Sequence, residues 1–207
     1  MAENVDEPHW LNVSRETLRR LEQLAGLVVQ WSAKINLVSK ASGQDLWKRH
    51  ILDSAQVYSL KPDCSAHWLD IGSGGGFPGL VVAVLADEKC PDLKVTLVES
   101  DQRKAVFLRE AARQLGLSAN IIRARIEDLQ PLDADILSAR ALAPLPILCS
   151  YADIHLSKTG AALFQKGQNH VAEVLEARRN WTFTLTTHAS RTDPAAVILE
   201  MKDLEHV

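Results

Sequence analysis

Residues 70–79 (DIGSGGGFPG) are the part of the chain whose residue types and spacing point most directly to ligand chemistry. Five of the ten glycines lie between Gly72 and Gly79, directly after a run with the composition of a buried strand, residues 67–71. Glycine can adopt positive φ angles and lets a ligand approach the backbone closely. The main-chain N–H groups of such a loop, and of a helix that begins after it, then face the ligand. The stretch therefore predicts a ligand-binding loop between a strand and a helix.

The ligand of this loop has three candidate identities. Gly74, Gly76 and Gly79 form a literal G-x-G-x-x-G, as in dinucleotide-binding folds, but this pattern starts two residues after the first glycine of the loop. A phosphate-binding P-loop requires a G-K-[ST] that does not follow here. The series Asp70-x-Gly72-x-Gly74-x-Gly76 resembles the first motif of class I S-adenosylmethionine-dependent methyltransferases. We favour the third identity and keep a dinucleotide enzyme and a purely structural loop as alternatives.

Acidic residues near predicted strand ends fit a nucleoside ligand. Asp70 is expected to face the cationic parts of the cofactor, directly or through water. Glu99 ends the predicted strand 94–99, where a carboxylate can accept hydrogen bonds from both ribose hydroxyls. Nicotinamide-dependent folds share this feature, so it supports a nucleoside without choosing the cofactor. Ile126 and Glu127 follow the third predicted strand, where the methyltransferase fold holds the adenine.

The elements that would position these residues are predicted from hydrophobic periodicity. Residues 1–62 are expected to form a helical N-terminal extension, with Ser14 as an N-cap, packed on the same domain as residues 63–207. From residue 67, short runs of β-forming residues alternate with helical patterns. Strands are predicted at residues 67–71, 94–99, 119–124, 134–139, 161–165, 181–187 and 195–201, and helices at 78–86, 104–115 and 168–179.

This alternation predicts an α/β fold with helices on both faces of a mainly parallel sheet. The last two strands follow one another without a helix, which predicts an antiparallel hairpin at one edge. A mainly parallel seven-stranded sheet with an antiparallel C-terminal hairpin resembles the Rossmann-like sheet of class I S-adenosylmethionine-dependent methyltransferases, not that of the dehydrogenases. We therefore expect this fold, with a helical N-terminal extension.

Composition narrows the class of protein. A net charge of −3 argues against a wholly basic nucleic-acid binder but leaves room for a local basic face. Cys64, Cys90 and Cys149 show the spacing of neither a zinc site nor a disulfide framework, and reduced thiols indicate the cytoplasm. The acidic N-terminus does not resemble a signal peptide, and no apolar run is long enough to span a membrane. We expect a cytoplasmic monomer without a metal.

Five motifs in order carry a more specific resemblance. They are WSAKINLVS (residues 31–39), RHILDS (49–54), DIGSGGGFPG (70–79), SARA (138–141) and QKGQ (165–168). On these motifs, which extend over nearly the full length, the chain resembles the bacterial 16S ribosomal RNA methyltransferase G family, also known as glucose-inhibited division protein B. The chain departs from the family pattern at two positions, and both departures are modest. Ser32 stands where asparagine is common in the family, and one additional alanine precedes the arginine of the family's S-R-A motif.

The resemblance implies a reaction, a partner and a site. The family transfers a methyl group from S-adenosylmethionine to N7 of one guanine, with S-adenosylhomocysteine as the product and 16S ribosomal RNA or the small ribosomal subunit as the partner. The resemblance places Gly72, Phe77, Ile126, Glu127 and Arg140 against the cofactor. Gly74 is added as a cofactor-binding residue because it lies in the glycine loop, and Glu99 because it ends its strand. A methyltransferase acting on a small molecule and a nucleotide-sensing module without catalysis remain alternatives.

The chemistry of guanine N7 determines what the residues must do. N7 carries a lone pair and no hydrogen, so its methylation requires neither a general base nor a metal, and positioning and electrostatics would carry the catalysis. Arg140 follows the fourth predicted strand, where a guanidinium can hold a base edge or the cofactor carboxylate. Arg49 and Lys166 lie inside motifs and are expected to contact RNA phosphates. For Asp53, a pair with Arg49, four residues before it, is predicted as the alternative to a ligand contact.

Overall fold

The computed structural model describes residues 8–38, 45–63 and 65–207, so Cys64, residues 39–44 and the acidic N-terminal residues 1–7 lie outside the described residues. The helices are α1 (Arg15–Ser32), the π-helix η2 (Trp47–Leu52), α2 (Asp53–Tyr58), α3 (Gly79–Lys89), α4 (Gln102–Gln114), the 3₁₀ helix η3 (Ile126–Asp128), α5 (Leu145–His155) and α6 (His170–Ala177). The strands are β1 (His67–Ile71), β2 (Lys94–Glu99), β3 (Asn120–Arg123), β4 (Ala134–Arg140), β5 (Leu156–Lys166), β6 (Trp181–Ala189) and β7 (Val197–His206).

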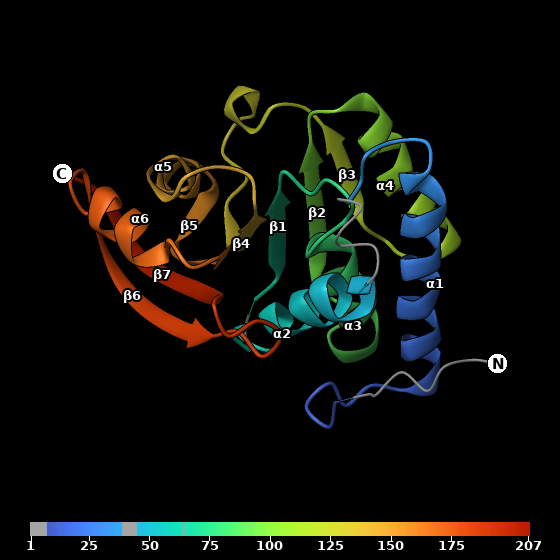
Figure 1. The fold of residues 1–207 in the computed structure, drawn as a ribbon. Coiled ribbons are helices and arrows are strands. Elements are labelled where there is room, and N and C mark those ends of the chain that lie inside the picture. The colour runs from blue at the N-terminus through green and yellow to red at the C-terminus, as the bar shows by residue number, and fades with distance from the viewer. Residues whose placement is uncertain (1–7, 39–44, 64) are drawn as a thin grey trace.

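The strands form a seven-stranded sheet in the order β3-β2-β1-β4-β5-β7-β6 (Figure 1). β1 to β5 pair in parallel, and β7 runs antiparallel to both β5 and β6. The predicted class I methyltransferase sheet, mainly parallel with an antiparallel C-terminal hairpin, is thus confirmed. The strand order reverses between β1 and β4, and ligands of open α/β sheets bind at the carboxyl ends of the strands at such a point.

Two apolar layers cover the two faces of the sheet. α1 to α4 pack over one face, around Trp68 of β1 and Ile136 of β4. α5 and α6 cover the other face, around Leu69 of β1 and Leu137 of β4. Because successive residues of a strand point to opposite faces, adjacent residues of β1 and of β4 belong to different layers.

The helical N-terminal segment packs on the sheet domain. α1 begins at the predicted N-cap, where the Ser14 hydroxyl accepts a hydrogen bond from the Thr17 amide at 3.1 Å. Its residues Leu21, Leu24 and Val28 are buried, and the helix packs against α3 and α4. The apolar residues whose spacing predicts this helix therefore form the face that contacts the sheet domain. A domain boundary at residue 62 stays a prediction.

The helix α5 is absent from the helices predicted above. Leu145, Leu148, Cys149 and Ala152 are all buried and follow the i, i+3, i+4, i+7 spacing of an amphipathic helix. Two prolines at the start of this run resemble a loop, although proline is well tolerated in the first turn of a helix. The periodic signal was present in the sequence and the prolines obscured it.

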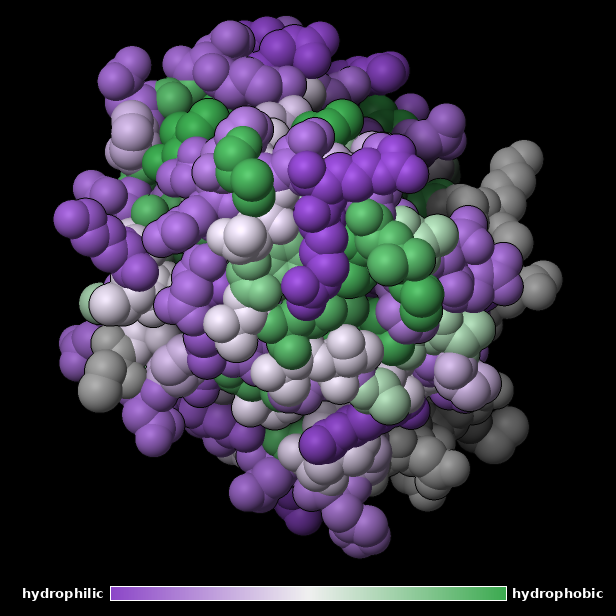
Figure 2. Space-filling model, turned by 90° about the vertical axis from the view of Figure 1, so that its left-hand side faces the viewer, coloured by the Kyte–Doolittle hydropathy of each residue, from purple (hydrophilic) through white to green (hydrophobic). Residues whose placement is uncertain are grey.

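The side of the molecule that carries α5, α6 and β6 is shown in Figure 2, where hydrophobic surface lies between hydrophilic side chains. Four exposed large hydrophobic residues belong to these two helices: Ile147 and Ile154 in α5, and Val171 and Leu175 in α6. The outer faces of α5 and α6 are therefore not uniformly polar.

Gly79 begins α3 in close contact with β1 and β2. A Cβ atom at this position would lie 2.6 Å from Asp70 Oδ2 and 2.8 Å from Leu97 Cγ. We expect Gly79→Ala to destabilise the protein by about 1–3 kcal/mol, because overpacking forces the surrounding atoms to shift. Urea unfolding followed by circular dichroism measures this difference.

The matched control is Gly26→Ala in α1, where no atom of the described residues beyond the neighbouring turns of α1 lies within 4 Å of the added Cβ. This exposed helix position is expected to gain up to about 1 kcal/mol from the change. Equal stability of the two variants would contradict the packing described for Gly79.

Candidate active site

The glycine loop follows β1 at the point where the strand order reverses. Gly72, Gly74 and Gly76 have φ angles of 64°, 53° and 86°, values that residues with a side chain rarely adopt. The Ser73 amide donates to the Val98 carbonyl of β2 at 3.2 Å, and the Gly76 amide donates to the Ser73 carbonyl at 2.7 Å. The loop is therefore a turn held by main-chain hydrogen bonds, and its glycines are required by backbone geometry.

Asp70 lies beneath this loop and is completely buried. Its Oδ1 accepts from the Ser138 hydroxyl of β4 at 2.7 Å, and its Oδ2 accepts from the Gly79 amide of α3 at 3.2 Å. Burial raises the pKa of Asp70 to about 6, and the hydrogen bond from Ser138 opposes this shift. The expectation that Asp70 faces the cofactor is wrong, because its carboxylate points into the protein and joins β1, β4 and α3.

Glu99 lies at the end of β2 beside the loop and is 6% exposed. Its Oε2 accepts from the Gly74 amide at 2.8 Å and its Oε1 accepts from the Asp101 amide at 2.8 Å. Each carboxylate oxygen can accept a further hydrogen bond. The structure therefore brings Glu99 and the glycine loop together, and the contact of Glu99 with ribose hydroxyls stays a prediction.

Ile126 and Glu127 lie in η3, at the same edge of the sheet. Ile126 is buried, and its carbonyl accepts from His155 Nε2 at 3.2 Å. Glu127 is exposed and accepts from the Tyr151 hydroxyl at 3.0 Å. A hydrogen bond from the backbone holds the pKa of Glu127 below its ordinary value, and the Tyr151 hydroxyl adds to this effect. Two residues of α5 therefore fix the turn that follows β3.

Arg140 ends β4, and its guanidinium is held by the RHILDS segment. Nη1 donates to the Arg49 carbonyl at 3.1 Å and to Asp53 Oδ2 at 3.3 Å, and Nη2 donates to His50 Nδ1. The guanidinium also lies 5.2 Å from the centre of the Phe77 ring. A guanidinium has five N–H donors, so two of them have no partner within the part of the chain that the structure describes. Arg140 can therefore still donate to a ligand.

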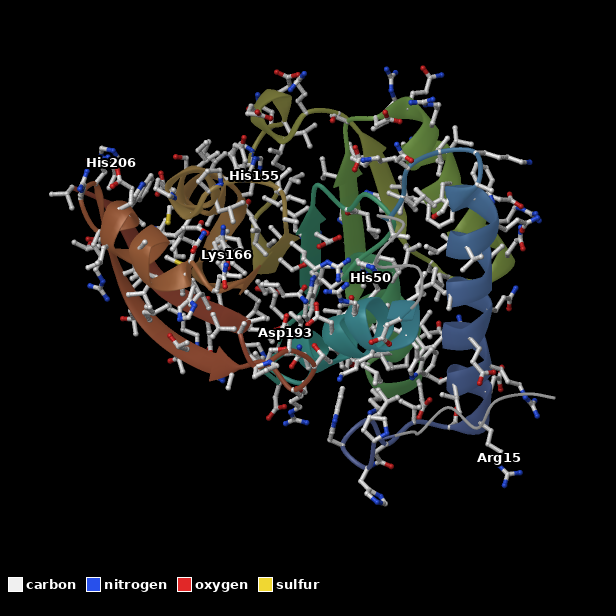
Figure 3. All side chains as sticks on the ribbon, in the orientation of Figure 1. Arg15, His50, His155, Lys166, Asp193 and His206 are labelled. Carbon is white, nitrogen blue, oxygen red and sulfur yellow. The ribbon has the colours of Figure 1, made fainter. Side chains whose placement is uncertain are left out.

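His50 and Phe77 support this guanidinium from the side. Their rings stack with centres 5.0 Å apart, and Figure 3 shows His50 near the middle of the molecule. Burial, together with the charges of Arg140 and Arg49, lowers the pKa of His50 to about 4, so the ring is neutral and Nδ1 can accept. Phe77 is 4% exposed, so its ring packs inside the protein, and its predicted contact with the cofactor stays a prediction.

Asp53 connects four separate segments. Its Oδ1 accepts from Gln56 Nε2 at 2.7 Å and from Thr192 Oγ1 at 2.9 Å, while its Oδ2 accepts from Arg140 and from Gln165 Nε2 at 2.5 Å. The predicted pair with Arg49 is wrong: Arg49 precedes Asp53 within the π-helix η2, whose wider turn displaces the i, i+4 alignment of an α-helix. The Arg49 side chain is exposed and its RNA contact stays a prediction.

A cavity of about 610 Å³ lies at the ends of β4, β5 and β7. Arg140, Gln165 and Lys166 line it, together with Leu142. A Cβ on Gly72 would lie 2.5 Å from Leu142 Cδ1, so Leu142 also packs on the glycine loop. The cavity is therefore adjacent to the loop, and its volume is within the range of small-ligand pockets.

Lys166 is paired inside the protein. Its side chain is 9% exposed, and Nζ lies 2.7 Å from Glu173 Oε2 and 2.9 Å from the Ala143 carbonyl. This burial does not favour the predicted contact with an RNA phosphate. Ser138, Gln165 and Glu173 were not predicted as site residues. The first two lie within the SARA and QKGQ motifs, which are the signal that could have identified them.

Within the described residues, no three His, Cys, Asp or Glu side chains are grouped as metal ligands would be. Across the same residues, no helix combines the length and the apolar character needed to cross a membrane.

Comparison with protein families and named relatives gives one consistent result. The model of the family described as rRNA small subunit methyltransferase G matches residues 17–195. A protein of Cereibacter sphaeroides named ribosomal RNA small subunit methyltransferase G is 52% identical over 197 residues, which cover 95% of each chain. A protein of the same name from Ruegeria pomeroyi is 50% identical over 203 residues, which cover 98% of this chain and 99% of the relative.

Solved structures agree on the fold. M. jannaschii TYW2, solved in complex with AdoMet, superposes with a TM-score of 0.59 at 14% identity and covers 84% of this chain and 80% of its own. A ribosomal protein L11 methylase from Lactobacillus delbrueckii subsp. bulgaricus superposes with a TM-score of 0.58 at 15% identity, covering 77% and 78%. The fold is therefore that of class I S-adenosylmethionine-dependent methyltransferases.

The raised pKa of Asp70 has a consequence for stability. The folded protein binds this proton more tightly than the unfolded chain, so Asp70 makes stability fall as pH rises between about 4 and 6, by about 3 kcal/mol, with no further change above this window. Asp70→Asn removes the titrating group. We expect the unfolding free energy of the wild type, minus that of Asp70→Asn, to decrease over this window in urea titrations. A difference that stays constant with pH would contradict the buried carboxylate.

Proposed function

The chain belongs to the ribosomal RNA small subunit methyltransferase G family, and from that premise we propose that it transfers a methyl group from S-adenosylmethionine to N7 of one guanine in 16S ribosomal RNA. The observation that carries the proposal is the family match over residues 17–195, whose glycine loop lies beside a ligand-sized cavity. The alternative, a methyltransferase acting on a small molecule, is not favoured, because relatives about half identical over nearly the whole chain are named for ribosomal RNA.

The residues at the loop fit S-adenosylmethionine. Among the described residues, and apart from its two chain neighbours, only the Gly72 carbonyl lies within 4 Å of a Cβ added at Gly74, so this side of the loop is open to a ligand. The Glu99 carboxylate is fixed beside it by two backbone amides and keeps acceptor capacity for ribose hydroxyls. We assign the amino-acid end of the cofactor to the backbone of Gly72 and Gly74, and the adenine to Ile126 and Glu127. When bound, the cofactor supplies a methyl group activated by a sulfonium.

The chain would contribute position and charge to the reaction. Guanine N7 has no hydrogen to remove, so no side chain is required as a base, and holding the reactants in line can supply most of the rate enhancement. The Arg140 guanidinium is oriented by Asp53 and His50 and keeps two free donors at the edge of the cavity. We assign Arg140 to hold the acceptor guanine or the cofactor carboxylate there.

We assign the RNA contact outside the cavity to the exposed Arg49 and its neighbour Lys48. Two adjacent cations at the start of the RHILDS segment can neutralise phosphates and make binding dependent on salt. In this proposal the enzyme acts as a monomer in the cytoplasm on 16S ribosomal RNA or the small subunit, and requires no metal.

Gly74→Val tests the cofactor site. The added side chain would occupy the open side of the loop, and we expect the dissociation constant for S-adenosylmethionine, measured by calorimetry, to rise more than about 10-fold. Gly116→Val is the matched control, because Gly116 also has a positive φ of 64° and, chain neighbours aside, no described residue within 4 Å of an added Cβ, but follows α4 away from the loop. It is expected to lose stability through backbone strain and to keep the affinity of the wild type. Wild-type affinity in Gly74→Val would place the cofactor elsewhere.

The reaction itself is tested by mapping N7-methylguanine in 16S ribosomal RNA from cells with and without this protein. We expect one modified guanine to lose its methyl group in the deletion strain and to regain it when the gene is restored. Purified protein should methylate small subunits or 16S RNA from the deletion strain and not small-molecule acceptors. A methylation map that is unchanged by the deletion would refute the proposal.

A further inference from the structure

The ion pair between Lys166 and Glu173 lines the cavity beside the cofactor loop and is not used by the mechanism above. Lys166 is the last residue of β5, and Glu173 lies in α6. Figure 3 shows Lys166 inside the molecule, on the side of β5. Arg140 and Lys166 point to opposite faces of the sheet, yet both line this cavity at the strand ends. A planar ligand in the cavity would therefore meet Arg140 on one side and the ion pair on the other.

The Glu173 carboxylate is fixed by one of its two oxygens. Oε2 accepts from Lys166 Nζ at 2.7 Å and from the Leu145 amide, the first of α5, at 2.8 Å. Two donors fill the two lone pairs of that oxygen. Oε1 has no hydrogen-bond partner within the described part of the chain, and the side chain is 27% exposed, so Oε1 is an oriented acceptor available to a ligand.

The Lys166 ammonium has one donor that no described residue accepts. An ammonium carries three N–H groups, of which one is directed to Glu173 and one to the Ala143 carbonyl at 2.9 Å. The pair thus offers the cavity a donor and an acceptor side by side, held in place by Ala143 of the loop that follows β4 and by the first amide of α5. Such a preorganised pair costs little to arrange when a ligand binds.

This arrangement complements one edge of guanine. Along that edge, the O6 acceptor is followed by the N1–H and 2-amino donors, whereas adenine presents a 6-amino donor followed by the N1 acceptor. We propose that Lys166 donates to O6 and that Glu173 Oε1 accepts from the 2-amino group of the guanine to be methylated, so that the ion pair selects guanine. This inference rests on the proposed function, because it concerns the base that enters the cavity.

The position of the cavity agrees with methylation at N7. Leu142 lines the cavity and packs on Gly72, so the space for the base adjoins the loop assigned to the cofactor. On guanine, O6 lies between N7 and N1. A base held through O6 and the 2-amino group therefore leaves N7 free at its other edge, for the cofactor and Arg140.

Substrate substitution tests the contact without any change to the protein. Small subunits are reconstituted with 16S RNA that carries inosine in place of the methylated guanosine. Inosine keeps O6, N1–H and N7 and lacks only the 2-amino group. We expect the kcat/KM of the wild type to fall by at least about 10-fold on the inosine substrate, because a hydrogen bond to a charged group is lost. Equal turnover of the two substrates would overturn the inference whatever the variants do.

Glu173→Gln completes a double-mutant cycle between side chain and substrate. The amide oxygen would take over the role of Oε2, and the amide nitrogen would then replace the acceptor at Oε1 by a donor. We expect kcat/KM to fall by at least about 10-fold on guanosine but by less than about 3-fold on inosine. Glu176→Gln is the matched control: Glu176 lies on the same helix and, among the described side chains, pairs only with the exposed Arg179 at 3.0 Å. It should retain wild-type values on both substrates.

A purely structural role for Glu173 predicts another pattern. Loss of the contacts to Lys166 and Leu145 would lower activity on guanosine and inosine by the same factor, and that outcome would overturn the inference. Affinity for S-adenosylmethionine, measured by calorimetry, is expected to stay within about 2-fold of the wild type in Glu173→Gln. A wild-type enzyme that methylates no guanine would refute the proposed function itself, which keeps the two failures distinct.

Discussion

The burial of one carboxylate, that of Asp70, is the constraint on which the rest of this structure depends. A buried charge costs several kcal/mol unless hydrogen bonds replace the lost water, and here the Ser138 hydroxyl and the Gly79 amide do so. Both donors must be present at once, so β4 has to lie beside β1 and α3 has to begin at Gly79. The glycine loop must then cover the short distance between Asp70 and Gly79. Positive φ angles at three glycines of the loop follow from this restriction.

A second carboxylate, that of Asp53, likewise joins separate elements through hydrogen bonds, at the neighbouring strand ends. It receives hydrogen bonds from α2, β4, β5 and the loop before β7, so motifs far apart in the sequence meet around one side chain. Strand register makes this meeting possible, because Arg140 pairs with Gln165 across β4 and β5. As a result, Arg140 reaches the cavity in an orientation set by the N-terminal segment. The helical N-terminal segment is therefore part of the site as well as of the hydrophobic core.

The sequence predicted what depends on local patterns and missed what depends on distant partners. The strands of the sheet, the glycine loop and the position of Glu99 at the end of its strand follow from strand periodicity and from the rule that parallel strands end at one edge. The direction of Asp70 could not be inferred, since it is set by Ser138, 68 residues away. The predicted pair of Asp53 with Arg49 was wrong because the residue types do not reveal the π-helical turn. The helix α5 was not predicted because two prolines in its first turn resemble a loop. The role of Glu173 depends on the close approach of α6 to β5, which no motif reports.

A crystal structure of the protein grown with S-adenosylhomocysteine tests the central claim most directly: that the loop above Asp70 binds a nucleoside that carries an amino acid. The account predicts density over Gly72 and Gly74, with ribose hydroxyls on the Glu99 carboxylate, adenine beside Ile126, and Asp70 still bonded to Ser138 and Gly79. Density at another place, or binding of a phosphate-bearing coenzyme in this cleft instead, would contradict it.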